Sequence, residues 1–327
     1  MMSQLPLDLV RTLLAVVDEG TFDAAAQALH VTPSAVSQRV KALEQRVGRV
    51  LLIREKPVRP TESGEVIVRF ARQLARLEHD AHAALGMTGP GEATRVSIAV
   101  NADSLATWFL PALTRVPEDV RPCYELLRED EQHTARLLRE GLVMAAVTSA
   151  PDAVAGCSVR PLGRMRYLPV AAPAFAERWL GFGAGVPPKA GAGVPTKAGA
   201  GGPTKVGSRV PLNDLIVDAP VVFFDRRDEF QDAFVRGLAG GRPAGARRHY
   251  VPTSEGFVDA VVAGMGWGMV PAVQAERLLH TGRLVNLAPE GTADAPLFWQ
   301  QWKLDSPALT AVAEAVAAEA AETLEAV

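Results

Sequence analysis

A short polar stretch near the N-terminus places hydrogen-bonding side chains at helical spacing. Between residues 32 and 47 the apolar side chains fall on one helical face, namely Val36, Val40, Leu43 and Val47. The opposite face carries Ser34, Ser37, Gln38 and Lys41. Small polar side chains on a helix fit the major groove of DNA, where a glutamine amide can form two hydrogen bonds with adenine. This pattern predicts a helix that reads base edges.

Three short helices are expected to position this face. Apolar residues at i, i+3 and i+4 predict helices over 7–19 and 21–29. Thr32 is a favourable N-cap for the third helix, and Pro33 fits its first position, where a missing N–H costs nothing. A tight turn between the second and third helices makes the group a helix-turn-helix.

Basic charge is concentrated in the same region. The chain has 34 basic and 37 acidic residues, but residues 31–60 contain seven basic and two acidic ones, a net +5, whereas residues 212–327 sum to −7. Residues 51–53 and Val58 predict the two strands of a wing, which places Arg54 beside the third helix. A basic block at one end of an acidic chain indicates a polyanion partner for one domain only. The alternative is a solvated charged face.

A long helix is predicted from residue 61 to residue 86. Its apolar residues alternate at spacings of three and four: Ile67, Phe70, Leu74, Leu77, Ala81 and Ala84. This heptad seam predicts pairing with a second copy of the helix, with Ile67, Phe70, Leu74 and Leu77 as dimerisation residues. The alternative is a seam that packs on its own chain.

The pattern changes after Val96 to short apolar strands that alternate with helices. Two such sets predict two α/β lobes with mostly parallel sheet and a ligand cleft at the carboxyl ends of the strands. A glycine- and proline-rich repeat at 183–210 predicts a disordered basic insertion. The expected domains are 1–60, 61–86 and 95–327, with lobe 1 at about 95–165 and 272–327 and lobe 2 at about 166–271.

Composition and motifs exclude several classes of protein. The 327 residues, 48% of them hydrophobic, allow two or three folded units. Apolar runs are too short to span a bilayer, and Asp8 and Arg11 interrupt any secretory signal, so we expect a cytoplasmic protein without membrane contact. Cys123 and Cys157 lack metal-ligand spacing and are predicted to be buried thiols. No hydrolase, nucleotide-binding or zinc-protease motif stands in the right context, so we expect no enzyme activity, cofactor or metal site.

With these elements in this order, the chain resembles a LysR-type transcriptional regulator over essentially its full length. The most specific segments are TFDAAAQALHVTPSAVSQRVKALEQRVG, LLIRE and PTESGE. Within the family it resembles the branch called LysG or ArgP, which regulates the export of basic amino acids. That likeness is carried by NADSLATWFLPAL (101–113), FFDRRDEFQDAF (223–234), VPTSEGFVDAV (251–261) and GMGWGMVP (264–271). The repeat at 183–210 departs from the family pattern.

The resemblance implies an α/β multidomain fold: a winged helix-turn-helix, a linker helix and a two-lobed effector-binding domain similar to periplasmic binding proteins. It assigns contacts with double-stranded DNA to Thr32, Ser34, Ser37, Gln38, Lys41 and Arg54. A dimer presents two such heads, so the operator should be an interrupted inverted repeat. The other implied partners are further copies of the chain, in a dimer or tetramer, and RNA polymerase.

A basic amino-acid effector, lysine or arginine, is also implied, with its site in the cleft. Asn101, Asp103 and Ser104 end a strand and open a helix, whose N–H groups suit an α-carboxylate; Asp103 is alternatively a plain N-cap. Carboxylates for a cationic side chain are expected from Glu129, Asp130 and Asp225, each alternatively a solvated loop acid. The remaining candidates are Thr148, Ser254, Glu255 and Trp267, of which Trp267 is equally well read as core.

Other functions stay open on the sequence. The lobes suit an enzyme or a periplasmic solute-binding module, but catalytic motifs and a signal peptide are missing. A LysR-type regulator with a different metabolite effector, or an architectural DNA-binding protein that needs no ligand, are the nearer alternatives. Whether any small molecule changes DNA binding or thermal stability discriminates between them.

Overall fold

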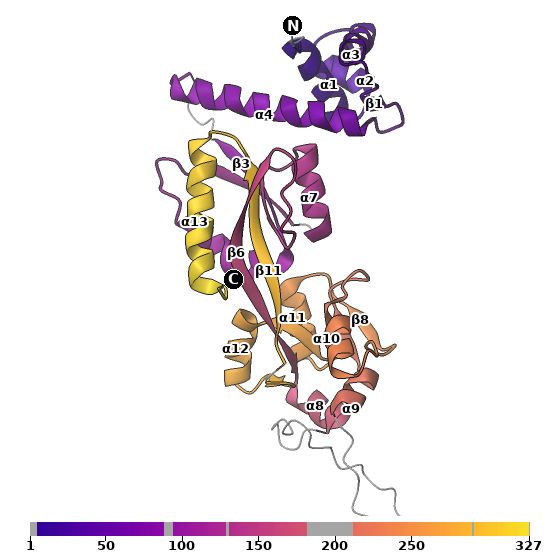
Figure 1. Cartoon of the computed structure of the whole chain (residues 1–327), viewed down its shortest axis with the longest axis vertical. Coiled ribbons are helices and arrows are strands. Elements are labelled where there is room, and N and C mark those ends of the chain that lie inside the picture. Colours follow the sequence, from indigo (N-terminus) through magenta and orange to yellow (C-terminus); the bar gives the residue numbers. More distant parts are fainter. Residues whose placement is uncertain (1–4, 88–93, 129–130, 182–211, 290, 327) are drawn as a thin grey trace, which may run out of the picture. The chain divides into compact units, whose positions relative to one another are not determined.

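The computed structural model describes residues 5–87, 94–128, 131–181, 212–289 and 291–326 (Figure 1). Glu129, Asp130 and the expected insertion at 183–210 therefore lie outside the described residues. The chain divides into two compact units. Unit 1 comprises residues 1–101, 113–161 and 298–317, and unit 2 comprises residues 102–112, 162–297 and 318–327. Among the described residues, no helix is long and apolar enough to cross a membrane.

The N-terminal head of unit 1 is a winged helix-turn-helix, as the sequence predicts. Its elements are α1 (Leu7–Asp18), α2 (Phe22–Ala28), α3 (Pro33–Val47), β1 (Leu52–Ile53) and β2 (Arg59–Pro60) (Figure 1). The hydroxyl of Thr21 accepts a hydrogen bond from the Ala24 N–H at 3.1 Å and so caps α2. Gly48 ends α3 in the left-handed conformation, with φ of 73°. β1 and β2 pair antiparallel and form the wing.

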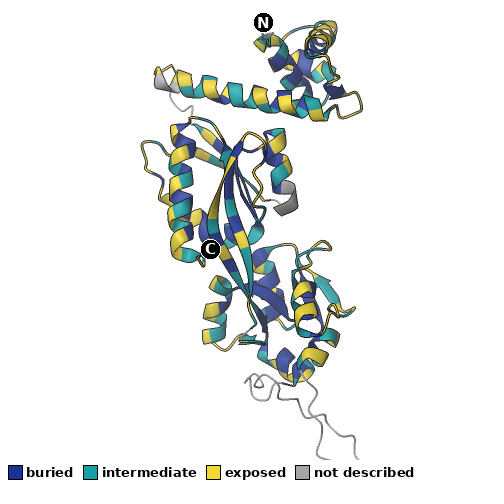
Figure 2. Ribbon diagram, viewed as in Figure 1, coloured by how far each residue is buried: buried dark blue, intermediate teal, exposed yellow. Residues whose placement is uncertain are grey.

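The core of the head explains which face of α3 is left outside. The fully buried apolar residues of α1 and α3 are Val10, Leu13, Val16, Val36, Val40 and Leu43. The linker helix α4 (Glu62–Ala84) adds Ile67, Val68 and Ala71 to the same core. Because the apolar stripe of α3 is used for packing, its polar side is directed to solvent (Figure 2).

The rest of unit 1 is an α/β lobe. Its elements are β3 (Arg95–Val100), β4 (Cys123–Arg128), α7 (Glu131–Glu140) and β5 (Ala145–Thr148), with part of α13 (Pro307–Thr323). β3 pairs parallel with both β4 and β5. Cys157 is buried, and burial raises the pKa of its thiol to about 11. Cys123 is exposed, so the prediction of two buried thiols is wrong for this residue, which begins an outer strand of the sheet.

Unit 2 is built around β6 (Cys157–Ala171), which pairs antiparallel with β9 (Gly268–Pro271) and β10 (Val285–Asn286). A second, small sheet pairs β7 (Val221–Phe223) and β8 (Arg248–Tyr250) in parallel. The other elements are α5 (Ala102–Ser104), the π-helical segment η1 (Leu105–Phe109), the first part of α6 (Leu110–Thr114), α8 (Pro173–Leu180), α9 (Leu212–Asp218), α10 (Phe230–Leu238), α11 (Ser254–Val262) and α12 (Ala272–His280).

The expectation of a mostly parallel sheet is wrong. The seven-stranded sheet has the order β10-β6-β11-β5-β3-β4, with β9 also on β6, and β11 (Ala293–Trp302) pairs antiparallel with β5, so the sheet is mixed rather than mostly parallel. The long strands β6 and β11 run through both units. Residues 272–297, which the sequence predicts in lobe 1, lie in unit 2, where β10 pairs with β6, and the predicted lobe boundaries stay a prediction.

Candidate DNA interface and effector site

The outer face of α3 presents the predicted base-reading residues. Ser34, Gln38 and Lys41 are exposed and Ser37 is half-buried, while Val40 on the other side of the helix is fully buried. A helix held through one apolar face in this way offers its polar side chains to a groove without rearranging the core. The arrangement suits contact with base edges and phosphates.

Thr32 directly precedes α3, and Arg54 follows the first strand of the wing. The Thr32 hydroxyl accepts a hydrogen bond from the Ala35 N–H at 3.2 Å, so it caps α3. On the wing, the Arg54 guanidinium lies 3.6 Å from the Glu44 carboxylate and 5.5 Å from the Phe22 ring centroid, with 57% of its side chain exposed. Arg54 is therefore held beside α3 with much of its charge accessible.

The predicted seam on α4 is divided between two environments. Ile67 is 8% exposed and belongs to the core of the head, which is the own-chain alternative for this residue. Phe70 and Leu77 are 37% and 43% exposed, and Leu74 is half-buried. Val66, one helical turn before Phe70, is 53% exposed as well. An apolar stripe thus remains on α4, and the dimerisation role of Phe70, Leu74 and Leu77 stays a prediction.

A cluster of hydrogen bonds around Asp103 brings together residues far apart in the sequence, all within unit 2. The Tyr167 hydroxyl donates to Oδ2 of Asp103 at 2.7 Å, and the Ser254 hydroxyl donates to Oδ1 at 2.7 Å. Behind Ser254, the Gln274 amide donates to the Ser254 Oγ at 3.2 Å. Asp103 comes from α5, Tyr167 from β6, Ser254 from the first turn of α11 and Gln274 from α12.

The Asp103 carboxylate is poorly solvated. Burial raises its pKa above the ordinary value, the hydrogen bonds from Ser254 and Tyr167 oppose this rise, and the neighbouring Glu255 carboxylate adds to it. A desolvated carboxylate is stabilised when a cation binds to it, because the charge then regains the partner that burial has removed. The cluster is therefore chemically suited to a cationic group.

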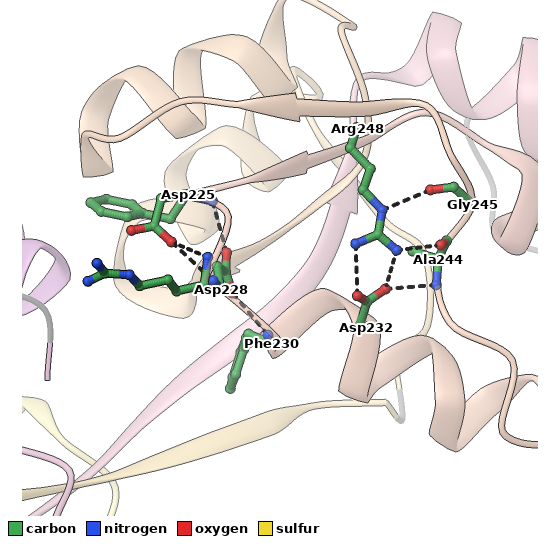
Figure 3. A network of polar contacts seen from close by, with 9 residues as sticks. Asp225, Asp228, Phe230, Asp232, Ala244, Gly245 and Arg248 are labelled. Carbon is green, nitrogen blue, oxygen red and sulfur yellow. Dashed lines mark hydrogen bonds and ion pairs between the residues drawn. The ribbon is translucent and has the colours of Figure 1, made fainter. Parts of the chain in front are cut away.

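The loop that follows β7 is fixed by two aspartates (Figure 3). Asp225 Oδ1 accepts hydrogen bonds from the N–H groups of Arg227 at 2.7 Å and Asp228 at 3.1 Å. The Asp228 carboxylate accepts from the N–H of Phe224 at 2.8 Å and of Phe230 at 2.9 Å, and burial raises its pKa. Asp225 thus shapes the loop, in line with its alternative as a loop acid. Phe230 packs edge-on against Tyr167, with ring centroids 4.6 Å apart.

The remaining effector candidates have varied surroundings. Asn101 and Thr148 belong to unit 1 and are 8% and 1% exposed; the Thr148 hydroxyl accepts from the Ala150 N–H at 3.1 Å. Ser104 is fully buried and Glu255 is exposed. Trp267 is fully buried in the main core of unit 2, with its ring 6.0 Å from that of Phe234, which fits its alternative as core.

Three residues of this region escaped the sequence prediction. Tyr167 lies on β6, a strand whose exposed residues hide the apolar alternation, and Gln274 lies on α12, which was not predicted. The sequence assigns no role to Phe230. The contacts of Tyr167 with Asp103 and Phe230 join positions more than 60 residues apart. Gln274 contacts Ser254, which lies 20 residues earlier on another helix, so no local pattern could reveal these contacts.

Comparisons with known proteins agree with this organisation. Residues 7–65 match the bacterial regulatory helix-turn-helix protein, LysR family, and residues 198–321 match the LysR substrate binding domain. The chain is 45% identical over 313 residues to the HTH-type transcriptional regulator LysG of Mycobacterium tuberculosis, covering 94% of this chain and 91% of that protein.

Two solved structures are similar over nearly the whole chain. The crystal structure of ArgP from Mycobacterium tuberculosis has a TM-score of 0.83 and 41% identity, covering 99% of this chain and 100% of that one. Full-length LysG of Corynebacterium glutamicum with bound effector Arg has a TM-score of 0.78 and 36% identity, covering 98% and 99%.

The chain therefore belongs to the LysR family of bacterial transcriptional regulators. It is a DNA-binding protein with an N-terminal winged helix-turn-helix and a C-terminal effector-binding domain, a class that is not enzymatic. Within the family its similarity is to the regulators named LysG and ArgP.

Proposed function

We propose that this protein is a cytoplasmic transcriptional regulator that binds lysine or arginine as its effector and acts on a gene for export of such an amino acid. The observation that carries the proposal is the Asp103 carboxylate, which is desolvated and held by two hydroxyl donors. A relative of 36% identity that has bound arginine as its effector supports the same chemical class of ligand.

The chemistry of the cluster favours a basic amino acid over a neutral or acidic one. The cationic group of the ligand would pair with Asp103, and the exposed Glu255 adds negative charge nearby. An acidic ligand would be repelled by the same carboxylates. The N-terminus of α11, capped by Thr253, supplies positive dipole charge for an α-carboxylate.

Ligand binding would act on DNA by a population shift. An effector changes the DNA-binding state only as far as it binds one conformation of the protein better than the other. We therefore propose that dimers or tetramers joined through α4 bind an interrupted inverted repeat and that the effector alters this binding or the engagement of RNA polymerase. Such an operator has two half-sites, and an assembly with two DNA-binding heads can contact both of them.

The first test is thermal unfolding of the purified full chain with each of the twenty amino acids. A ligand at one hundred times its dissociation constant stabilises the native state by about 2.7 kcal/mol, which is a measurable rise in Tm. We expect a rise with lysine and arginine and none with glutamate or leucine. A rise with another metabolite alone would contradict the basic amino-acid effector while leaving the DNA-binding class intact.

The target gene needs a separate experiment. Chromatin immunoprecipitation in the native host, with and without added lysine or arginine, maps the sites that the protein occupies. We expect occupied sites upstream of a gene for a membrane exporter, with transcript levels that respond to the amino acid. Sites found only at genes unrelated to amino-acid transport would contradict this part of the proposal.

A further inference from the structure

Tyr167 connects the Asp103 carboxylate to the loop after β7. Its hydroxyl donates to Oδ2 of Asp103 at 2.7 Å, while its ring packs against Phe230 with centroids 4.6 Å apart. Phe230 in turn begins α10 at the end of the loop, where its N–H donates to Asp228 at 2.9 Å. A rotation of the Tyr167 ring would thus break a hydrogen bond and an aromatic contact together.

The two side chains that donate hydrogen bonds to Asp103 are held in place in different ways. Ser254 is held by the first turn of α11 and by Gln274, so it is positioned by secondary structure. Tyr167 reaches the carboxylate from β6, and its ring packs edge-on against Phe230 as well as against the core of unit 2. The Asp228 carboxylate closes the loop by accepting hydrogen bonds from the N–H groups of Phe224, four residues before it, and Phe230, two residues after it. The position of Oδ2 therefore depends on the loop as well as on the strand.

We propose that Tyr167 is a positioning residue of the effector site: its hydroxyl, with its ring held by Phe230 and the Asp228-closed loop, fixes Oδ2 of Asp103 for the cationic group of the ligand. This inference rests on the proposed function, because it concerns how a basic ligand is held. Both oxygens of Asp103 then stand in fixed directions, each with one hydroxyl donor and further acceptor capacity for ligand N–H groups.

Tyr167→Phe tests this role with little change of shape, since only the hydroxyl is lost and the ring contact with Phe230 is kept. We expect the dissociation constants for lysine and arginine, measured by titration calorimetry at pH 7, to rise about ten- to a hundredfold, as expected for a lost hydrogen bond to a charged group. Tyr250→Phe is the matched control, because Tyr250 is 40% exposed on β8 of the same unit. It should bind both amino acids as the wild type does.

The pH dependence separates positioning from a merely structural role. Among the described residues, the titratable groups that act on the Asp103 carboxyl are Tyr167 from β6 and Glu255 from α11, next to the neutral Ser254. Removing the Tyr167 donor raises the pKa of Asp103 further, so the carboxylate is lost to protonation at a higher pH. The affinity loss of Tyr167→Phe should therefore be larger at pH 6 than at pH 8.

The outcomes distinguish this inference from the function on which it rests. If the wild type binds neither lysine nor arginine, the proposed function is overturned and this inference with it. If the wild type binds and Tyr167→Phe binds equally well, or is weakened equally at every pH, this inference alone is overturned. Phe230→Leu is the second variant: it keeps the hydroxyl but loosens the ring, and it should show a smaller loss with the same dependence on pH.

Discussion

Arg248 and Asp232 form a two-point ion pair in unit 2, with Nη1 2.9 Å from Oδ2 and Nη2 3.0 Å from Oδ1 (Figure 3). Asp232 also accepts the Ala244 N–H at 2.9 Å, and Arg248 donates to the carbonyls of Ala244 at 2.7 Å and Gly245 at 3.0 Å. The guanidinium lies 4.8 Å from the centroid of the Phe223 ring. The pair thus fastens the segment before β8 to α10.

Removing this ion pair should lower the free energy of unfolding rather than change the function of the protein. Asp232→Ala leaves a largely buried guanidinium and the Ala244 N–H without their partner, so we expect the free energy of unfolding to fall by about 3 kcal/mol in urea titrations. The control is Asp214→Ala, which removes the exposed partner of Arg242. An exposed pair contributes under about 1 kcal/mol, and equal losses in both variants would contradict the assigned role.

Thr32 is expected to act through the helix cap. Thr32→Ala removes the acceptor for the Ala35 N–H and should lower the free energy of unfolding by about 1 kcal/mol. Thr32→Ser keeps the acceptor oxygen and should restore stability. If Thr32→Ser is as unstable as Thr32→Ala, the cap is not what stabilises α3. DNA affinity measured on the same variants shows whether the hydroxyl contributes a phosphate contact in addition.

Truncation of Gln38 and truncation of Lys41 should change DNA binding in different ways. Gln38→Ala removes a group that can pair with an adenine, so we expect a loss of about 1–3 kcal/mol in operator binding and relaxed preference at one base pair. Lys41→Ala should weaken binding to all sequences and lower the salt slope by about one unit. Fluorescence anisotropy with operator and scrambled duplexes at several salt concentrations separates the two. Gln27→Ala, exposed on α2, is the control and should change neither quantity.

Two residues of the seam on α4 should have different roles, one in the stability of the head and one in the pairing of subunits. Ile67→Ala empties a position in the core of the head and should cost about 2–4 kcal/mol of stability. Leu77→Glu places a charge on an exposed apolar position, so it should prevent pairing of helices with little effect on the fold of the subunit. Sedimentation velocity measures the assembly, and Ala75→Glu is the control with the same added charge on the same helix. A Leu77→Glu protein that sediments like the wild type would contradict the seam.

The head was predictable because its signals are local. Thr32, Pro33 and Gly48 mark the ends of α3, and the spacing of Val36, Val40 and Leu43 defines its packed face; all of these lie within one helix or beside it. The structure confirms each of these elements. Local caps and periodicity decide the structure here, since the buried stripe on each helix is long enough to select one packing.

The effector-binding domain was less predictable because long-range pairing decides it. β6 and β11 are extended strands with exposed residues among the apolar ones, and they were missed. Without them the antiparallel pairings and the membership of residues 272–297 in unit 2 could not be foreseen. Asp103 and Ser254 were proposed from their places at helix starts, but the contact between them and the role of Tyr167 depend on the sheet.

The stability of the protein should depend on pH through Asp103. Burial raises the pKa of this carboxyl in the folded chain above its value in the unfolded chain. At pH values between these two pKa values, the native state therefore binds more protons than the unfolded state. Stability conferred by the neutral form is therefore lost as pH rises through the folded pKa. Asp103→Asn removes the buried charge, so we expect it to have a higher Tm than the wild type at pH 7.

The difference in Tm between Asp103→Asn and the wild type should shrink as the pH falls below the unfolded pKa of about 4, because the wild-type carboxyl is then protonated in both states. The same variant should lose binding of lysine and arginine, because it lacks the negative charge that pairs with the cationic group of the ligand. The buried carboxylate thus lowers the stability of the protein but is needed for binding. Asp119→Asn, on an exposed aspartate, is the control and should leave Tm unchanged at both pH values. A Tm of Asp103→Asn below that of the wild type at pH 7 would mean that the two hydroxyl donors outweigh the desolvation of the carboxylate.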